Sequence, residues 1–229
     1  MGLAERYRSV QERIRAAERA AGRESGSIEL IVVTKNHPAQ LVLDLHALGQ
    51  RSFGENRDQE ARPKALEVSL AGVGDADWHF VGQLQSNKVK SVLEYASCIH
   101  SIDRASLVRE LSKQLGRTPR AVSGFIELNL TDDPNRGGVG EADLLPLAES
   151  LLEIDGFNLL GVMAVASLDG QPECDFERAV AMSEQLKTLA PTADKISMGM
   201  SDDFEIAISM GATHIRVGSA ITGPRPTTA

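Results

Sequence analysis

Residues 28–35, which read Ile-Glu-Leu-Ile-Val-Val-Thr-Lys, are the stretch from which the fold can be inferred. The run of Ile, Leu and Val contains no Gly or Pro, which is typical of a strand buried on both faces. Asn36-His37-Pro38 then stops the strand, and a helical pattern begins. Lys35 is therefore expected at the carboxyl edge of a sheet, where α/β barrels and open α/β sheets carry their chemistry.

A lysine at the end of a buried strand has two interpretations. Most such lysines are solvated charges that close the strand. An amine that apolar neighbours partly shield instead has a lowered pKa and can form a Schiff base with a carbonyl compound. Residues elsewhere in the chain are needed to choose between a solvated lysine and a Schiff-base lysine.

Strand and helix patterns alternate along the whole chain. Strands are predicted over residues 28–35, 51–54, 77–81, 98–101, 123–129, 159–164, 195–197 and 214–217. The intervening helices are predicted over residues 38–48, 57–70, 87–95, 103–115, 144–152, 172–189 and 202–210. Asp103 is the expected N-cap of its helix, and Pro63 should kink the helix over 57–70 or delay its start.

Eight strands that alternate with helices indicate parallel βαβ units, which close naturally into a barrel. An apolar stripe over residues 3–21 predicts one further helix before the first strand. We therefore expect a single (β/α)8 domain over residues 1–229, with 1–22 as a covering helix and 28–225 as the barrel. A doubly wound open sheet is the alternative fold.

Composition excludes several classes of protein. The net charge of −8 argues against nucleic-acid or anionic-membrane binding. No apolar run approaches the roughly 20 residues of a membrane span, and the start of the chain does not read as a signal peptide. Cys98 and Cys174 show no C-x-x-C pattern, so reduced thiols in a cytoplasmic protein are expected.

The loops after the seventh and eighth strands are candidates for a phosphate site. Barrels often bind phosphate there through backbone N–H groups, and Ser201-Asp202-Asp203 and Gly218-Ser219-Ala220 offer small residues at these positions. A phosphate site and the Lys35 amine at one barrel mouth would together suit a phosphorylated aldehyde.

Each of these residues also has a simpler explanation. A Gly-Ser pair after a strand is usually a turn, and Asp202 with Glu205 resembles a helix cap. Arg216 could pair with an internal carboxylate. His79, between Trp78 and Phe80, is more often a hydrogen-bonded core histidine than a ligand.

Five segments closely resemble motifs of the pyridoxal phosphate homeostasis protein family: residues 33–35, 53–56, 78–88, 197–203 and 215–221. The resemblance implies a barrel of the alanine-racemase N-terminal type that holds pyridoxal 5′-phosphate (PLP) as an internal aldimine. It also implies a role in buffering and delivering PLP, without established turnover. The cofactor-binding residues that it implies are Lys35 for the Schiff base, Ser201, Gly218 and Ser219 for the phosphate, Arg216 for the pyridine nitrogen, and Asn56 near the ring.

The chain departs from the family pattern at several positions on the rim. Asn36-His37, Asp58 and Ser219 replace the residues expected there, and Arg136-Gly137-Gly138 and Gly223-Pro224-Arg225 only approximate the family's segments. Because a guanidinium only donates hydrogen bonds, a pyridine nitrogen facing Arg216 must stay unprotonated. The ring is then a weak electron sink, which suits storage or a mild racemase.

Three other functions are less consistent with the sequence. A PLP-dependent racemase needs a second base, which in alanine racemases is a tyrosine from a separate β domain. The only tyrosines here, Tyr7 and Tyr95, are both predicted on helices away from the mouth. A metal-dependent hydrolase is disfavoured because the five histidines form neither H-x-H nor H-E-x-x-H, and a pure scaffold would not need a buried lysine. The partners expected are PLP and PLP-dependent apo-enzymes, and a monomer and a weak homodimer both remain open.

Overall fold

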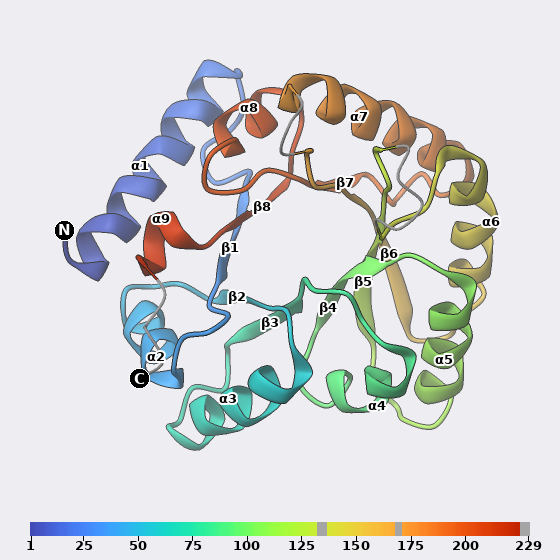
Figure 1. Cartoon of the computed structure of the whole chain (residues 1–229), viewed down its shortest axis with the longest axis horizontal. Helices are drawn as coiled ribbons and strands as arrows, with labels where there is room; N and C mark the ends of the chain where they lie inside the picture. Colours follow the sequence, from blue (N-terminus) through green and yellow to red (C-terminus); the bar gives the residue numbers. More distant parts are fainter. Residues whose placement is uncertain (132–136, 168–170, 225–229) are drawn as a thin grey trace.

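The computed structural model describes residues 1–131, 137–167 and 171–224, and within them eight parallel strands close into one barrel. Figure 1 looks into the barrel, with the helices arranged around it. The strands are β1 (Glu29–Val33), β2 (Ser52–Glu55), β3 (Asp77–Phe80), β4 (Cys98–Ile102), β5 (Val122–Glu127), β6 (Phe157–Met163), β7 (Lys195–Ser197) and β8 (His214–Val217).

The helices are α1 (Leu3–Ala20), α2 (Ala39–Ala47), α3 (Asp58–Leu70), α4 (Val89–Val92), α5 (Ala105–Leu115), α6 (Glu141–Leu152), α7 (Pro172–Leu189), α8 (Phe204–Ser209) and α9 (Ser219–Thr222), with a 3-10 turn η1 (Ser86–Lys88) before α4. Strand β1 pairs in parallel with both β2 and β8, which closes the barrel. The predicted (β/α)8 fold is confirmed, and the open-sheet alternative is wrong.

Several predicted boundaries need correction. Strand β1 ends at Val33, so Lys35 lies in the turn that follows it. The helix predicted over 87–95 is instead one turn of 3-10 helix followed by one α-helical turn. Val and Ser in this segment are weak helix formers. The side chains of Val89 and Val92 are buried within the single α-helical turn.

Of two predictions about single residues, that for Asp103 is wrong, and of the two effects expected from Pro63 the delayed helix start is wrong. Arg104, not Asp103, is the N-cap of α5, and the Asp103 carboxylate forms an ion pair with the Arg104 guanidinium at 2.5 Å. Pro63 lies inside α3, which nevertheless begins at Asp58, so the helix start is not delayed.

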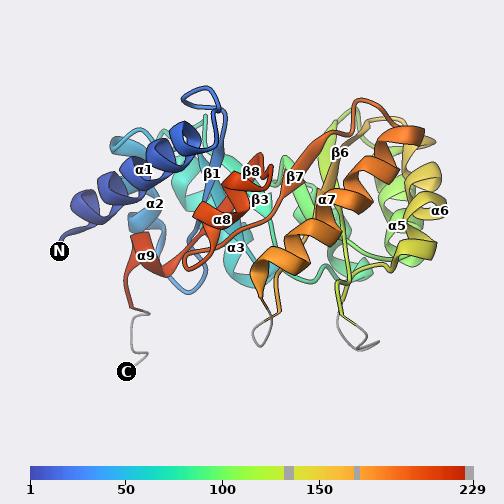
Figure 2. The same ribbon diagram turned by 90° about the horizontal axis from the view of Figure 1, so that it is seen from above.

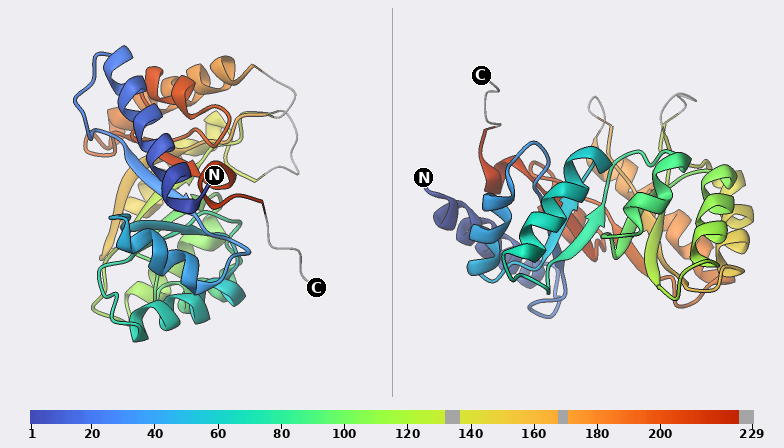
Figure 3. Two further views of the ribbon diagram at one scale, coloured as in Figure 1. Left: turned by 90° about the vertical axis from the view of Figure 1, so that its left-hand side faces the viewer. Right: turned by 90° about the horizontal axis from the view of Figure 1, so that it is seen from below.

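Helix α1 lies outside the repeating units, as predicted, and packs against α8 and α9 (Figures 2 and 3). Arg6 donates hydrogen bonds to the backbone oxygens of Ile221 and Thr222 on α9, at 2.7 and 3.3 Å. Arg13 pairs with Glu205 of α8 at 2.6 Å and stacks over the Phe204 ring. Helix α1 therefore braces the two short helices that follow β7 and β8.

Among the described residues, every helix is too short or too polar to cross a membrane. The structure thus gives no membrane-spanning helix in that part of the chain.

Candidate functional site

A cavity of about 250 Å³ opens at the carboxyl ends of the strands. Five of the six residues predicted to bind a cofactor line it together: Lys35, Ser201, Arg216, Gly218 and Ser219. The sixth, Asn56, lines a separate cavity of about 500 Å³ beside α3.

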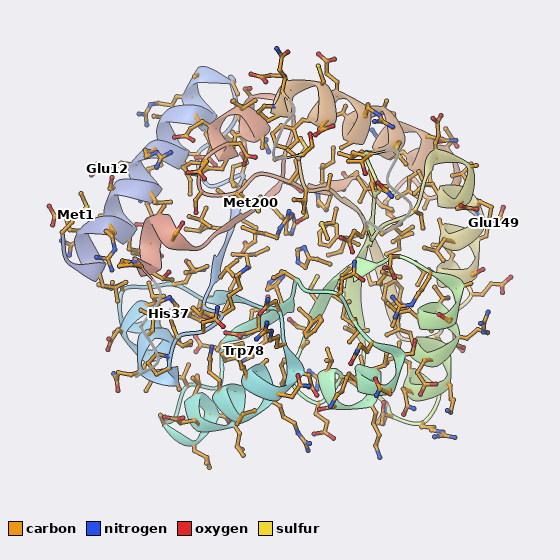
Figure 4. The ribbon with its side chains drawn as sticks, in the orientation of Figure 1. Met1, Glu12, His37, Trp78, Glu149 and Met200 are labelled. Carbon is orange, nitrogen blue, oxygen red and sulfur yellow. The ribbon has the colours of Figure 1, made fainter. Side chains whose placement is uncertain are left out.

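The rim of the smaller cavity carries His37 and Met200, whose side chains are labelled in Figure 4. His37 is one of the residues that depart from the family pattern. Burial and the positive charge of Lys64 lower its pKa, so the imidazole is neutral at neutral pH. Lys35 lines the same cavity as His37 and Met200.

The loop after β7 is shaped by a glycine that no other residue could replace without strain. Gly199 has φ 92°, and a Cβ there would lie 2.6 Å from the Ala207 Cβ. The next amide, Met200 N, donates a hydrogen bond to Asp203 Oδ1 at 2.5 Å. Asp203 rather than Asp202 is the N-cap of α8, so the predicted cap of Asp202 with Glu205 is wrong.

The loops after β7 and β8 bring hydrogen-bond donors together. Gly218 N donates to Ser201 Oγ at 3.3 Å, and the hydroxyls of Ser219 and Ser201 lie 3.4 Å apart. Within the described ranges, the backbone N–H groups of Ser201, Asp202 and Ser219 have no hydrogen-bond acceptor. Since all these residues line the cavity, this end of it can accept an anion with several oxygens. The Asp202 carboxylate at the same wall opposes that charge.

Arg216 is the buried cation of the cavity, with 5% of its surface exposed. Its guanidinium donates to Ser197 O and Oγ at 2.9 and 2.5 Å and to Ala164 O at 2.8 Å. None of the ion pairs within the described part of the chain includes Arg216, although the negative charges of Glu127 and Asp203 act on it and oppose the lowering of its pKa. Burial lowers the pKa of Arg216 to about 10, so it remains charged at neutral pH. A guanidinium has five N–H donors, so these three hydrogen bonds leave N–H groups of Arg216 available for an acceptor in the cavity.

A chain of hydrogen bonds runs from Arg216 through the barrel interior. Ser197 Oγ lies 2.9 Å from His100 Nδ1, and His100 Nε2 lies 2.9 Å from His79 Nδ1. His79 Nε2 then lies 3.3 Å from Asp77 Oδ2. Because arginine only donates and an ionised carboxylate only accepts, two neutral imidazoles satisfy every link in one way, with the proton of each on Nε2. His79 is thus a hydrogen-bonded core histidine, as the simpler interpretation has it.

The same interior holds a set of metal-ligand types that linear spacing did not reveal. Ligand atoms of His79, Cys98 and His100 lie within 4.8 Å of one another. Burial lowers the pKa of His100 well below its usual range and raises that of the Cys98 thiol. Both nitrogens of each imidazole already have protein partners, so the hydrogen-bond chain accounts for this cluster.

Asn56 is held at the mouth by close packing with the loop after β3. A Cβ on Gly82 would lie 2.3 Å from the Asn56 backbone oxygen. The Asn56 Oδ1 atom is buried and lacks a hydrogen-bond partner among the residues that the structure describes. A buried acceptor without a donor is costly, so this oxygen is suited to a ligand that supplies one.

Ser197, His100, Glu55 and Lys64 are functional candidates to which the sequence analysis gave no role. Alternation within 98–102 places Cys98 and His100 on the same face of β4, and an inward polar residue in a barrel strand is a signal that could have been used. Arg136 and Arg225, two of the family departures, lie outside the described residues.

Comparison with known proteins places this barrel in a class. Residues 6–226 match the family model for the alanine racemase N-terminal domain. An alanine racemase from Corynebacterium glutamicum shares the fold, with a TM-score of 0.65 and 16% identity; the chain covers 61% of that protein.

More similar relatives narrow the class. Pyridoxal phosphate homeostasis proteins from Escherichia coli K12 and Mycobacterium leprae are 36% and 38% identical, over 97% and 94% of this chain and 97% and 90% of theirs. The structure of PipY from Synechococcus elongatus, solved with PLP bound, has a TM-score of 0.84 and 34% identity over 97% of this chain and all of that one. The chain therefore belongs to the pyridoxal phosphate homeostasis protein family, within the alanine racemase N-terminal domain class.

Proposed function

We propose that this protein binds PLP in the cavity at the carboxyl ends of its strands and takes part in intracellular vitamin B6 homeostasis. The PLP-bound structure of PipY and the names of the relatives from E. coli and M. leprae support the proposal. A cytoplasmic location and delivery of PLP to apo-enzymes belong to the same proposal.

One observation carries it: a lysine, a buried arginine and an anion site line a single small cavity. PLP has an aldehyde, a pyridine nitrogen and a phosphate, and each group has a matching partner here. An aldehyde condenses with a neutral amine, losing water, and the imine can be exchanged for another amine. That reversibility is what storage and delivery require.

The roles follow from donor and acceptor chemistry. Lys35 supplies the amine, and the hydroxyls of Ser201 and Ser219 with the amide of Gly218 and its neighbours bind phosphate oxygens. Arg216 donates to the pyridine nitrogen and keeps it unprotonated. Asn56 lines the separate cavity beside α3, so its unpartnered Oδ1 would accept a hydrogen bond only from a part of the ligand that reaches beyond the Lys35 cavity.

Neither tyrosine of the chain supports racemase activity. Tyr7 is buried on α1, where its hydroxyl meets Gln50 Oε1 at 3.1 Å, and Tyr95 follows α4. Neither lines the cavity that holds Lys35. A racemase removes a proton on one face of its substrate and returns one on the other, so a single lysine is insufficient. We therefore propose binding and exchange without turnover.

The experiment is a PLP titration followed by visible absorption. The wild type and Lys90→Ala, which removes an exposed lysine, should develop the band of a PLP imine, and Lys35→Ala should not. Lys35→Ala should still bind PLP weakly, in competition with inorganic phosphate. A wild type without the band, or a Lys35→Ala variant that retains it, would refute the proposal.

A further inference from the structure

Lys35 lies on a tight turn that helix α3 holds from outside the barrel. Thr34 N donates to Gly54 O at 3.0 Å, and Thr34 O accepts a hydrogen bond from His37 N at 3.1 Å. Asn36 has φ 62°, a left-handed conformation that is uncommon outside glycine. The backbone N–H of Asn36 donates a hydrogen bond to Glu60 Oε2 of α3 at 3.2 Å. The direction in which Lys35 leaves the turn therefore depends on contacts with α3.

Lys64, one helical turn after Glu60, makes the most buried of these contacts. Its ammonium donates to Thr34 O at 2.9 Å and to Glu55 Oε1 at 2.5 Å. Thr34 Oγ1 donates to the same carboxylate oxygen at 2.7 Å. Lys64 is 6% exposed and Glu55 is fully buried. The side chains of Thr34, Glu55 and Lys64 and the Thr34 carbonyl thus form one hydrogen-bonded cluster at the residue that precedes Lys35.

Stability alone does not explain a buried ion pair at this place. Removing two charges from water is costly, and apolar pairs of similar volume often stabilise a fold as well or better. Burial raises the pKa of Glu55, and the charge and hydrogen bond of Lys64 oppose that shift. Glu55 Oε2 has no partner in the described part of the structure. What the pair supplies that an apolar pair could not is a donor fixed on the Thr34 carbonyl.

We propose that Lys64, held by Glu55, is a positioning residue for Lys35: it fixes the Thr34–His37 turn so that the Lys35 amine points into the cavity. The inference rests on the proposed function, because it assigns Lys64 a role in attachment of PLP to Lys35. The anion site lies on the loops after β7 and β8, and the hydrogen bonds of this cluster and of the anion site share no partner among the described residues. Loss of the cluster should therefore weaken covalent attachment and spare phosphate binding.

The test compares two ligands that differ only at the reacting carbon. PLP carries the aldehyde, whereas pyridoxine 5′-phosphate has the same ring and phosphate but cannot form an imine. The variants are Lys64→Met and the double variant Lys64→Met with Glu55→Gln. The double variant leaves no unpaired buried charge, so it keeps the test decisive if the single variant fails to fold. Lys90→Met is the control for removal of an exposed lysine.

We expect the double variant to bind PLP about tenfold more weakly than the wild type and pyridoxine 5′-phosphate equally well. Borohydride reduction should label a smaller fraction of Lys35 at equal PLP occupancy, and Lys90→Met should match the wild type. Equal loss of affinity for both ligands, or no loss for either, would overturn the inference. A wild type that forms no adduct would refute the proposed function and the inference with it.

Discussion

Replacing Gly82 by alanine tests how the loop after β3 holds Asn56 at the barrel mouth. A Cβ at position 82 would lie 2.3 Å from the Asn56 backbone oxygen and 2.7 Å from its Cα. Backbone atoms cannot rotate away as a side chain can, so one of the two segments must shift. Overpacking of this kind costs about 1–3 kcal/mol. For a chain of this length we expect Tm to fall by roughly 2–12 °C.

The matched control is Gly74→Ala, where a Cβ meets nothing within 4 Å. That variant should melt at or slightly above the wild type, because alanine restricts the unfolded chain more than glycine does. Thermal unfolding by calorimetry measures both variants. A titration with PLP should also show weaker binding by Gly82→Ala, since Asn56 moves with the loop. If Gly82→Ala melts together with Gly74→Ala, the close approach of these two backbones is not real.

Three further outcomes are expected. His214 has a pKa lowered to about 4, mainly by burial, so this residue binds more protons in the unfolded chain between pH 4 and 6.5. This one group should make stability in urea fall by about 1.4 kcal/mol per pH unit on acidification through that window, in addition to the share of His100, whose pKa burial also lowers. The slope of a His214→Gln variant should therefore be shallower than that of the wild type, and an equal slope would contradict this. Arg6→Met should loosen α9, because it removes the hydrogen bond to Ile221 O, and should weaken PLP binding several-fold in a titration. Arg8→Met, which removes an exposed arginine on α1, should bind PLP like the wild type. Equal affinities of the two variants would show that α1 does not brace the anion site. In the native protein Cys174 should react with a thiol reagent and buried Cys98 only after unfolding; rapid labelling of both would mean that the barrel interior is open.

Much of the fold could be predicted because each element carries its own local pattern. Pro172 at the first turn and core spacing along the next residues predicted α7 with its observed bounds. The short strands β7 (Lys-Ile-Ser) and β8 (His-Ile-Arg-Val) also matched, because each lies between a helical pattern and a segment of small or polar residues. Local patterns failed where a neighbour decides the outcome, as at Asp103, whose carboxylate pairs with Arg104 instead of capping α5.

Only part of the site could be predicted from local sequence patterns. The positions of Lys35 and of the loops after β7 and β8 could be predicted because parallel strands deliver their ends to one edge. Which inward residues meet depends on the register around the closed barrel, and no local period reports it. The contact between His100 on β4 and Ser197 on β7, and the pair between Lys64 and Glu55, are therefore properties of the folded chain.

Whether Lys35 is the amine that holds PLP is tested most directly by chemical labelling. The purified protein is incubated with PLP and reduced with borohydride, and the modified peptide is identified by mass spectrometry. We expect one pyridoxyl group on the peptide that contains Lys35. A label on another lysine, or no label at all, would contradict it.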